Sequence, residues 1–138
     1  MTDRTAVGDI SLAAYPKLRS GKVREIFDLD DRLLFVATDR VSAFDVILPN
    51  LIPGKGRLLT EISRFWFEQT HHLGPNHLVT CSLDGLDLTR DERVQLEGRS
   101  MLVRKAERID IECVVRSRLA GSGWVEYREH GTLAGEPL

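Results

Sequence analysis

The sequence has little of what marks secreted, membrane-spanning or zinc-binding proteins. Its 138 residues include two cysteines, Cys81 and Cys113, which stand far apart with no second cysteine near either. This spacing favours two ordinary buried thiols over a disulfide framework or a zinc site. No stretch approaches the ~18 apolar residues of a transmembrane helix. Residues 1–8 lack the apolar run of a secretory signal, so we expect a cytoplasmic protein without a membrane partner.

A large excess of charge of one sign is also missing. Lysine and arginine total 19, aspartate and glutamate total 21, and the formal net charge is −2. A nucleic acid or an anionic membrane is therefore not expected as the main partner, although this balance allows a local basic pocket. Hydrophobic residues make up 42% of the chain, which is enough for a core that needs neither disulfides nor metal.

The first half of the chain predicts two strands and one long helix. Residues 23–29 and 33–38 have strand character, and the Asp-Asp-Arg turn between them predicts a β-hairpin. After a loop-rich stretch over 39–56, apolar residues recur at three- and four-residue steps until a Gly-Pro stop, which predicts an amphipathic helix. Two of its aromatic residues, Phe65 and Trp66, are expected in the core. The whole apolar face consists of Leu58, Leu59, Ile62, Phe65, Trp66 and Leu73.

The second half predicts shorter elements. Residues 78–81, 101–106 and 109–119 have strand character, and the polar stretch 84–98 is expected to be partly irregular. A helix over 124–130 is expected to end at the glycine that follows it. The mixture predicts an α+β fold with mostly antiparallel pairing.

A glycine and two cations begin the first predicted strand. Gly21 allows the backbone to approach a ligand closely. Strand alternation would put Lys22 and Arg24 on the same side, where both could meet a polyphosphate. The signal is weak alone, because the Walker A pattern is absent. Taken by itself, this segment favours two solvated charges on an exposed strand face.

Two further segments put polar groups in loops. Asp39, Arg40 and Ser42 directly follow a predicted strand, which is a common position for binding residues. A simple ion pair between Asp39 and Arg40 that orders the loop is an equally open interpretation. Residues 53–57 bracket Lys55 with glycines ahead of the long helix. That pattern suits an anion-binding loop, with a plain surface turn as the alternative.

The segment 112–123 is the most informative part of the sequence. Alternation puts Glu112 and Arg116 on one strand face, and on a solvated face they would form a weak surface pair. However, the predicted strand runs into Gly-Ser-Gly and then a helix. Backbone N–H groups and the Ser122 hydroxyl could then bind an anion that Arg116 holds bidentately. A phosphate pocket is the sharper hypothesis.

Other kinds of site are not indicated. His71 and His72 are adjacent, so they point to different helix faces and cannot chelate one metal. The patterns G-x-S-x-G, H-E-x-x-H and G-x-G-x-x-G are absent.

These segments together resemble the SAICAR synthetase (phosphoribosylaminoimidazole-succinocarboxamide synthase) family. The resemblance covers nearly the whole chain, from about residue 18 to residue 135, and its clearest marker runs from Glu112 to Ser122. The segments that carry it are 21–27, 34–45, 52–56, 63–67 and 111–122.

The resemblance implies an ATP-dependent ligase of purine synthesis with a SAICAR synthase-like, ATP-grasp-like α+β fold. The family joins the carboxylate of carboxyaminoimidazole ribonucleotide (CAIR) to the amino group of L-aspartate, with ATP and Mg²⁺, through an acyl phosphate. No catalytic residue is assigned. The implied ATP-binding residues are Gly21, Lys22, Val23, Arg24, Val103, Arg104 and Lys105, and the implied substrate-binding residues are Asp39, Arg40, Ser42, Lys55, Arg116 and Ser122.

The resemblance also implies two lobes. An antiparallel N-terminal lobe is expected over 1–104 and the beginning of a second lobe over 105–138. The family's Mg²⁺-binding motif, L-[IV]-D-x-K-x-E-F-G, does not occur in the sequence, so the chain is expected to be part of a longer ligase whose metal ligands lie beyond Leu138. Two alternatives stay open: a truncated, non-catalytic nucleotide- or phosphate-binding module, and a small RNA-binding domain.

Overall fold

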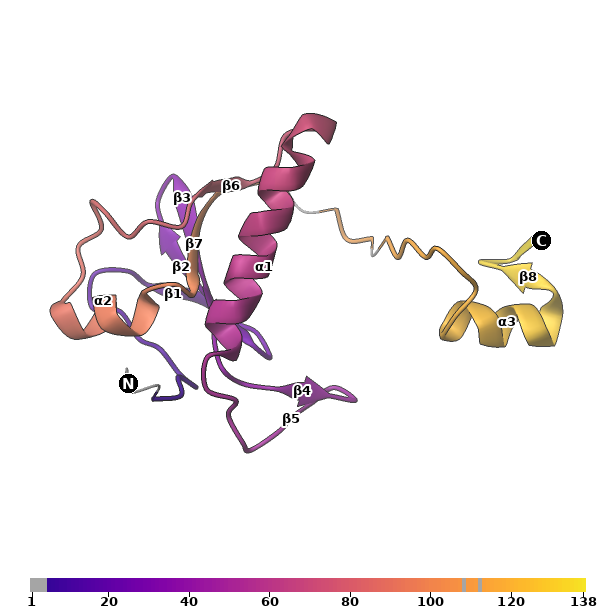
Figure 1. Ribbon diagram of the computed structural model, residues 1–138, viewed down its shortest axis with the longest axis horizontal. Coiled ribbons are helices and arrows are strands. Elements are labelled where there is room, and N and C mark those ends of the chain that lie inside the picture. The colour runs from indigo at the N-terminus through magenta and orange to yellow at the C-terminus, as the bar shows by residue number, and fades with distance from the viewer. Residues whose placement is uncertain (1–4, 108, 112) are drawn as a thin grey trace. The chain divides into compact units, whose positions relative to one another are not determined.

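The structure is a computed structural model that describes residues 5–107, 109–111 and 113–138 (Figure 1). It separates into two compact units, one up to Ala106 and one from Glu107 to Leu138. That these units are the two lobes of a larger enzyme stays a prediction. No helix in the described residues is long and apolar enough to cross a membrane.

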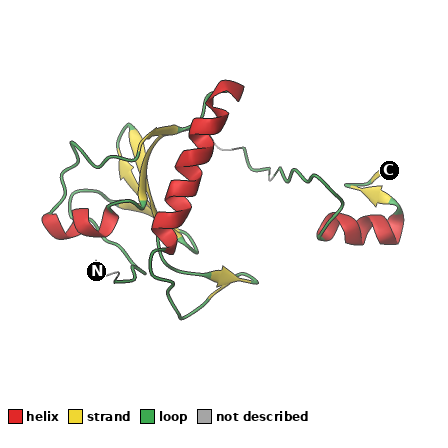
Figure 2. Cartoon of the chain, in the orientation of Figure 1, coloured by secondary structure: helices red, strands yellow, loops and turns green. Residues whose placement is uncertain are grey.

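The first unit is built on one antiparallel sheet (Figure 2). The predicted hairpin is confirmed, since Leu29 pairs with Arg32 and Asp30 has the positive φ of 59° that the tight turn requires. The predicted strands near 78–81 and 101–106 are also confirmed, and the antiparallel α+β class with them. The sheet order is β1 (Lys17–Ser20), β2 (Arg24–Leu29), β3 (Arg32–Ala37), β7 (Ser100–Arg104) and β6 (Leu78–Thr80).

Strand alternation gives this sheet two different faces. One, which we call the core face, carries side chains such as Phe27 and Leu34, both fully buried. The other, which we call the helix face, carries Arg24, Phe35 and Met101, which lie beside the long helix. The core-face cluster consists of Ile10, Phe27, Leu34, Val36, Leu83 and Leu96.

The predicted long helix is confirmed as α1 (Lys55–Thr70), followed by the short 3₁₀ helix η1 (His71–Leu73). The expectation that its aromatic residues belong to the core is wrong, because Phe65 is 51% and Trp66 58% exposed. The buried residues of α1 are small, Gly56 and Thr60. A side chain on Gly56 would collide with the Ala37 carbonyl, so the helix approaches β3 through a small residue, while Phe65 and Trp66 stay largely exposed.

A second helix, α2 (Arg90–Leu96), occupies part of the stretch that was expected to be irregular. Its N-terminus has a capping box: Thr89 accepts from the Glu92 amide, and the Glu92 carboxylate accepts from the Thr89 amide. Leu96 at its end is fully buried in the core cluster. The Thr-x-x-Glu pattern is a sequence signal for a helix start, so this helix was predictable.

The predicted loop between β3 and α1 contains a small hairpin of β4 (Ser42–Ala43) and β5 (Val46–Ile47). Its two turn residues, Phe44 and Asp45, have φ values of 49° and 64°. The left-handed region is uncommon for a residue as bulky as phenylalanine. This hairpin therefore holds a fully exposed aromatic side chain in a strained turn.

The second unit contains α3 (Ser122–His130), β8 (Thr132–Leu133) and β9 (Glu136–Pro137). The predicted helix and its glycine stop are confirmed, since Gly131 has the left-handed conformation (φ 69°) of a helix end.

The strand expected over 109–119 is wrong, because the described residues of that stretch form no strand. Their apolar side chains are exposed; Val115, for example, is 95% exposed. Cys113 is exposed as well, so the expectation of a buried thiol fails there, whereas Cys81 is half-buried. The predicted surface-pair residue Glu112 lies outside the described residues.

Candidate functional site

The predicted glycine turn is tied to the end of β3. The Gly21 amide donates to the Arg24 carbonyl over 2.8 Å and closes the turn. From β3's end, the Thr38 hydroxyl donates to the Val23 carbonyl over 2.9 Å, and Arg40 Nη2 donates to the Gly21 carbonyl over 2.9 Å. The backbone of the turn is therefore held at both sides by residues that follow a central strand.

Lys22 lies within this turn, ahead of β2. Because β2 begins at Arg24, strand alternation does not reach Lys22, and the prediction that it shares a side with Arg24 by alternation does not hold. Its ammonium lies 2.5 Å from the carboxylate of Asp45 at the tip of the β4–β5 hairpin. The hydrogen bond and charge of Lys22 hold the pKa of Asp45 below its usual value.

The helix face of the sheet has an incompletely covered strip along β2 and β3. Arg24 stands at one end and the ion pair between Lys105 and Asp28, with Nζ and Oδ1 2.6 Å apart, stands at the other. Between them lie the half-buried apolar side chains of Ile26 and Phe35. At about 3.3 Å per residue, the six residues of β2 make this strip roughly 20 Å long.

Of the predicted residues 103–105, Val103 and Arg104 end β7 and Lys105 follows it at the same end of the strip. Val103 is 1% exposed and is paired with Leu33 of β3 on one side and Leu78 of β6 on the other, so the residue is buried within the sheet. The Arg104 amide donates to the His77 carbonyl over 2.8 Å, and the Arg104 side chain is exposed. The hydrogen bond from Lys105 holds the pKa of Asp28 below its usual value.

Asp39 is a fully buried carboxylate. Arg99 holds it with Nη1–Oδ1 and Nη2–Oδ2 distances of 3.0 and 3.1 Å. The backbone amides of Gly56 and Val7 each donate to it over 2.9 Å. Burial alone would raise the pKa of Asp39, but these partners outweigh burial and the pKa is lowered. The residue thus joins the end of β3 to the first turn of α1 and to the N-terminal segment, and a direct contact with a substrate does not follow from its position.

Arg40 does not pair with its neighbour Asp39, so the simple ion pair between them is ruled out. Its Nη1 lies 2.7 Å from Oε1 of Glu25 instead. Ser42, in β4, is half-buried and pairs with Ile47 across the small hairpin.

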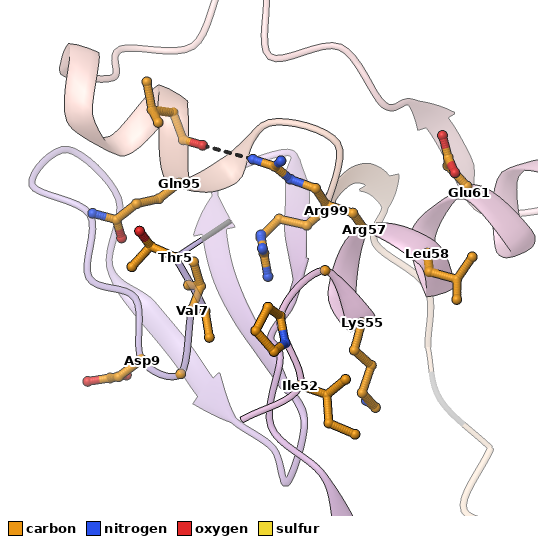
Figure 3. Close-up of a pocket in the computed structure, with 15 residues that line it drawn as sticks. Thr5, Val7, Asp9, Ile52, Lys55, Arg57, Leu58, Glu61, Gln95 and Arg99 are labelled. Carbon is orange, nitrogen blue, oxygen red and sulfur yellow. Dashed lines mark hydrogen bonds between the residues drawn. The ribbon is translucent and has the colours of Figure 1, made fainter. Parts of the chain in front are cut away.

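Lys55, the first residue of α1, lines a separate cavity of about 920 Å³ (Figure 3). The cavity lies between the N-terminal segment, the start of α1 and the end of α2. Arg57 crosses its rim and donates to the carbonyls of Glu97 and Val94 over 3.0 and 3.5 Å. Among the described residues that line this cavity, Lys55 is the one predicted site residue. The glycine turn does not line it, so the structure does not bring Lys55 together with that turn.

In the second unit the structure brings the two predicted phosphate-binding residues together. Arg116 Nη2 donates to the Ser122 hydroxyl over 3.3 Å. A side chain at Gly121 would lie 3.2 Å from Arg116 Nη1, so the guanidinium covers this glycine directly ahead of α3. Gly121 is the N-cap residue of α3 and has a positive φ of 58°. This cation, hydroxyl and helix N-terminus are the groups that an anion needs.

Three residues near these sites were not predicted from the sequence: Glu25, Arg99 and Asp45. Their partners lie 15, 60 and 23 positions away along the chain. No local pattern reports such pairings. Within the described ranges, no group of three or more His, Cys, Asp or Glu side chains could hold a metal ion.

Comparison with known proteins identifies the class to which this α+β chain belongs. A model of the family described as SAICAR synthetase matches residues 17–138. A solved structure titled SAICAR synthase is 41% identical and superimposes with a TM-score of 0.87, covering 96% of this chain and 48% of that one. A second, SAICAR-synthase from Saccharomyces cerevisiae complexed with SAICAR, is 41% identical, has a TM-score of 0.86 and has the same coverage.

Two sequence relatives are similar to this chain as well. The phosphoribosylaminoimidazole-succinocarboxamide synthase of Syntrophotalea carbinolica is 54% identical, over 90% of this chain and 43% of its own length. That of Halorhodospira halophila is 47% identical, over 100% and 47%. The chain belongs to the SAICAR synthetase family, and it spans a little under half the length of these relatives.

Proposed function

We propose that this chain supplies the ATP-binding residues and the ribonucleotide-phosphate clamp of a ligase that joins L-aspartate to CAIR, giving SAICAR, ADP and phosphate. The proposal rests on family membership and on one observation in particular. Arg116 covers Gly121 and donates to Ser122 at the start of α3. Sequence pattern and geometry thus favour the same phosphate-binding role independently.

The helix face of the sheet supports the role in ATP binding. Its apolar strip could receive the base. Lys105, the residue directly after β7, lies at one end of this strip. Lys22, in the glycine turn at the other end, is half-exposed and can move from Asp45 to a phosphate. A nucleotide extended along the strip would meet both ends.

The chemistry then needs two steps. The CAIR carboxylate attacks the γ-phosphorus, so that a C–O–P bond forms, ADP leaves and an acyl phosphate results. The aspartate amine attacks the acyl carbon, loses a proton and expels inorganic phosphate. Arg116 and Ser122 would hold CAIR by its phosphate during both steps, which keeps its carboxylate in line. Mg²⁺ belongs to this chemistry in the family, but the described residues do not form a site that fits it, and no step is assigned to it. A cytoplasmic location is part of the same proposal.

Binding by the isolated chain tests the clamp. Titration calorimetry with CAIR should give a dissociation constant that Arg116→Ala raises about 10- to 150-fold, because a charge-assisted contact worth roughly 1.5–3 kcal/mol is lost. Arg118→Ala, a change of the same kind two residues away, should leave it unaltered. Equal affinity of the Arg116→Ala and wild-type chains would refute the clamp.

The second candidate is a non-catalytic nucleotide- or phosphate-binding module. The absence of a metal-binding cluster from the described residues favours it. It predicts thermal stabilisation by ATP and CAIR without release of ADP when aspartate and Mg²⁺ are added. Formation of SAICAR by the isolated chain would exclude this candidate.

A further inference from the structure

Glu25 is a carboxyl side chain on the face of the sheet that is otherwise packed with apolar groups. It belongs to β2, next to Phe27 on the same face, and its side chain is 0% exposed. A carboxylate in such a place is costly unless cations and hydrogen bonds compensate it. Arg40 Nη1 lies 2.7 Å from Oε1, the Ser20 hydroxyl donates to Oε1 over 3.1 Å, and Lys17 Nζ lies 3.6 Å from Oε2.

The carboxylate orients a guanidinium whose other end holds the glycine turn. Arg40 is 14% exposed and uses Nη1 for Glu25 and Nη2 for the Gly21 carbonyl. The planar guanidinium fixes the angle between these two contacts. A rigid connection therefore runs from a buried carboxylate on β2, through Arg40, to the residue immediately before Lys22.

Stability alone is a weak reason for this arrangement. A buried ion pair can often be replaced by apolar residues of similar volume without loss of stability, whereas removal of one partner leaves an uncompensated charge. The pair is also imperfectly satisfied, because Arg40 Nε and Glu25 Oε2 are buried and have no hydrogen-bond partner among the described residues. What the pair does supply is a fixed position for the Gly21 carbonyl.

We propose that Glu25 is a positioning residue: through Arg40 it fixes the Gly21 carbonyl, and thereby holds the Lys22 turn in the conformation that receives the nucleotide phosphates. This inference rests on the proposed function of Lys22. It also revises the role of Arg40 from a substrate contact to the middle of a positioning chain.

The decisive variant is Glu25→Met with Arg40→Met, in the complete 138-residue chain. It removes both charges at similar volume, so the fold should keep its thermal midpoint while the turn loses its attachment. Two measurements follow each variant: the dissociation constant for ATP, and hydrogen exchange at the Gly21 and Thr38 amides, which hydrogen bonds to Arg24 and Val23 protect. Both should change by about tenfold or more, as expected for the loss of charge-assisted contacts, while exchange at Leu34 in the core stays constant.

Three outcomes decide the question. Wild-type ATP affinity and wild-type exchange at Gly21 in a folded double variant would overturn the proposal. If the double variant does not fold, Arg40→Lys decides: its ammonium keeps the charge but lacks the planar fork, and unchanged exchange at Gly21 would again overturn it. If the wild-type chain does not bind ATP, the role of Lys22 fails, while exchange at Gly21 still tests the attachment. Asp91→Asn, which removes an exposed charge from α2, is the control that should change nothing.

Discussion

The buried pair of Asp39 and Arg99 allows a test in which the pH dependence of stability should change sign. Both side chains are nearly inaccessible, at 0% and 2% exposed, and two contacts near 3 Å join them. Arg99→Met keeps the bulk of the side chain and removes its charge. The Asp39 carboxylate then keeps two backbone donors, the amides of Gly56 and Val7, and loses its cation.

The expected cost at pH 7 is about 3–5 kcal/mol, because removal of one partner leaves a buried charge without compensation. Total stabilities of small domains are roughly 5–15 kcal/mol, so the variant should be folded but marginal. Adding Asp39→Asn should restore part of the loss, since the neutral amide oxygen can still accept from Gly56 or Val7. Arg64→Met removes an exposed arginine whose contact to Glu68 is 3.8 Å long, and it should cost less than ~0.5 kcal/mol.

The sign of the pH dependence follows from the pKa of Asp39. In the wild type, burial raises this pKa, but Arg99 and the two amides lower it further than burial raises it. The folded pKa lies below the unfolded value of about 3.9, so the contribution of Asp39 is fully present above that value and is lost as pH falls through the folded pKa. Without Arg99, burial should dominate and the folded pKa should rise above the unfolded one. Stability is then greatest below pH ~3.9 and declines as pH rises through the new folded pKa.

Urea unfolding followed by far-ultraviolet circular dichroism at pH 4, 5.5 and 7 measures both effects. From pH 4 to 7 the free energy of unfolding of the Arg99→Met chain should fall relative to that of the wild type. A loss below about 1 kcal/mol at pH 7 would refute the reasoning, since that is the size expected for a solvated pair. The same pH profile as the wild type would refute it as well.

Two further changes test the packing of the helices. Gly56→Ala should destabilise the chain by more than about 1 kcal/mol in chemical denaturation, because its methyl group would collide with the Ala37 carbonyl, although alanine usually favours helices. The control is Gly74→Ala, which should be neutral because a methyl group there meets nothing within 4 Å. A stabilised Gly56→Ala chain would contradict the close approach of α1 to β3. Thr89→Ala should cost about 1 kcal/mol, because the capping box of α2 is lost, and an unchanged thermal midpoint would mean that the cap does not limit stability.

Local signals account for the parts of the fold that the sequence predicts. The hairpin of β2 and β3 follows from turn residues between two apolar strands, and α1 follows from its periodicity. Periodicity locates an apolar face but does not say what that face meets. On α1 the sheet lies against Gly56 and Thr60, which carry no hydrophobic signal, while Trp66 is exposed.

The residues of the candidate site were likewise only partly predictable from local signals. The sequence indicates which loops carry polar residues, because such residues follow strand ends. It does not indicate which of them reach a ligand and which pair with other residues of the fold. Asp39 and Arg40 are adjacent, yet each pairs with a residue on another strand or strand end, Arg99 and Glu25 respectively. Both pairings depend on the completed sheet, so spacing alone could not predict them.

In the segment after β7, two predicted site residues come into contact although the described residues around them do not form the predicted strand. Apolar residues such as Ile109 and Val115 have strand propensity, but a strand also needs a neighbour for its backbone groups. The described residues provide none there, and these side chains are 77% and 95% exposed. The contact of Arg116 with Ser122 spans six positions and needs only the turn at Gly121 and the first turn of α3. The proposed phosphate clamp therefore depends on α3 rather than on a strand, so a change such as Val115→Thr should leave CAIR binding unaltered, whereas the loss of the positive φ at Gly121 should abolish it.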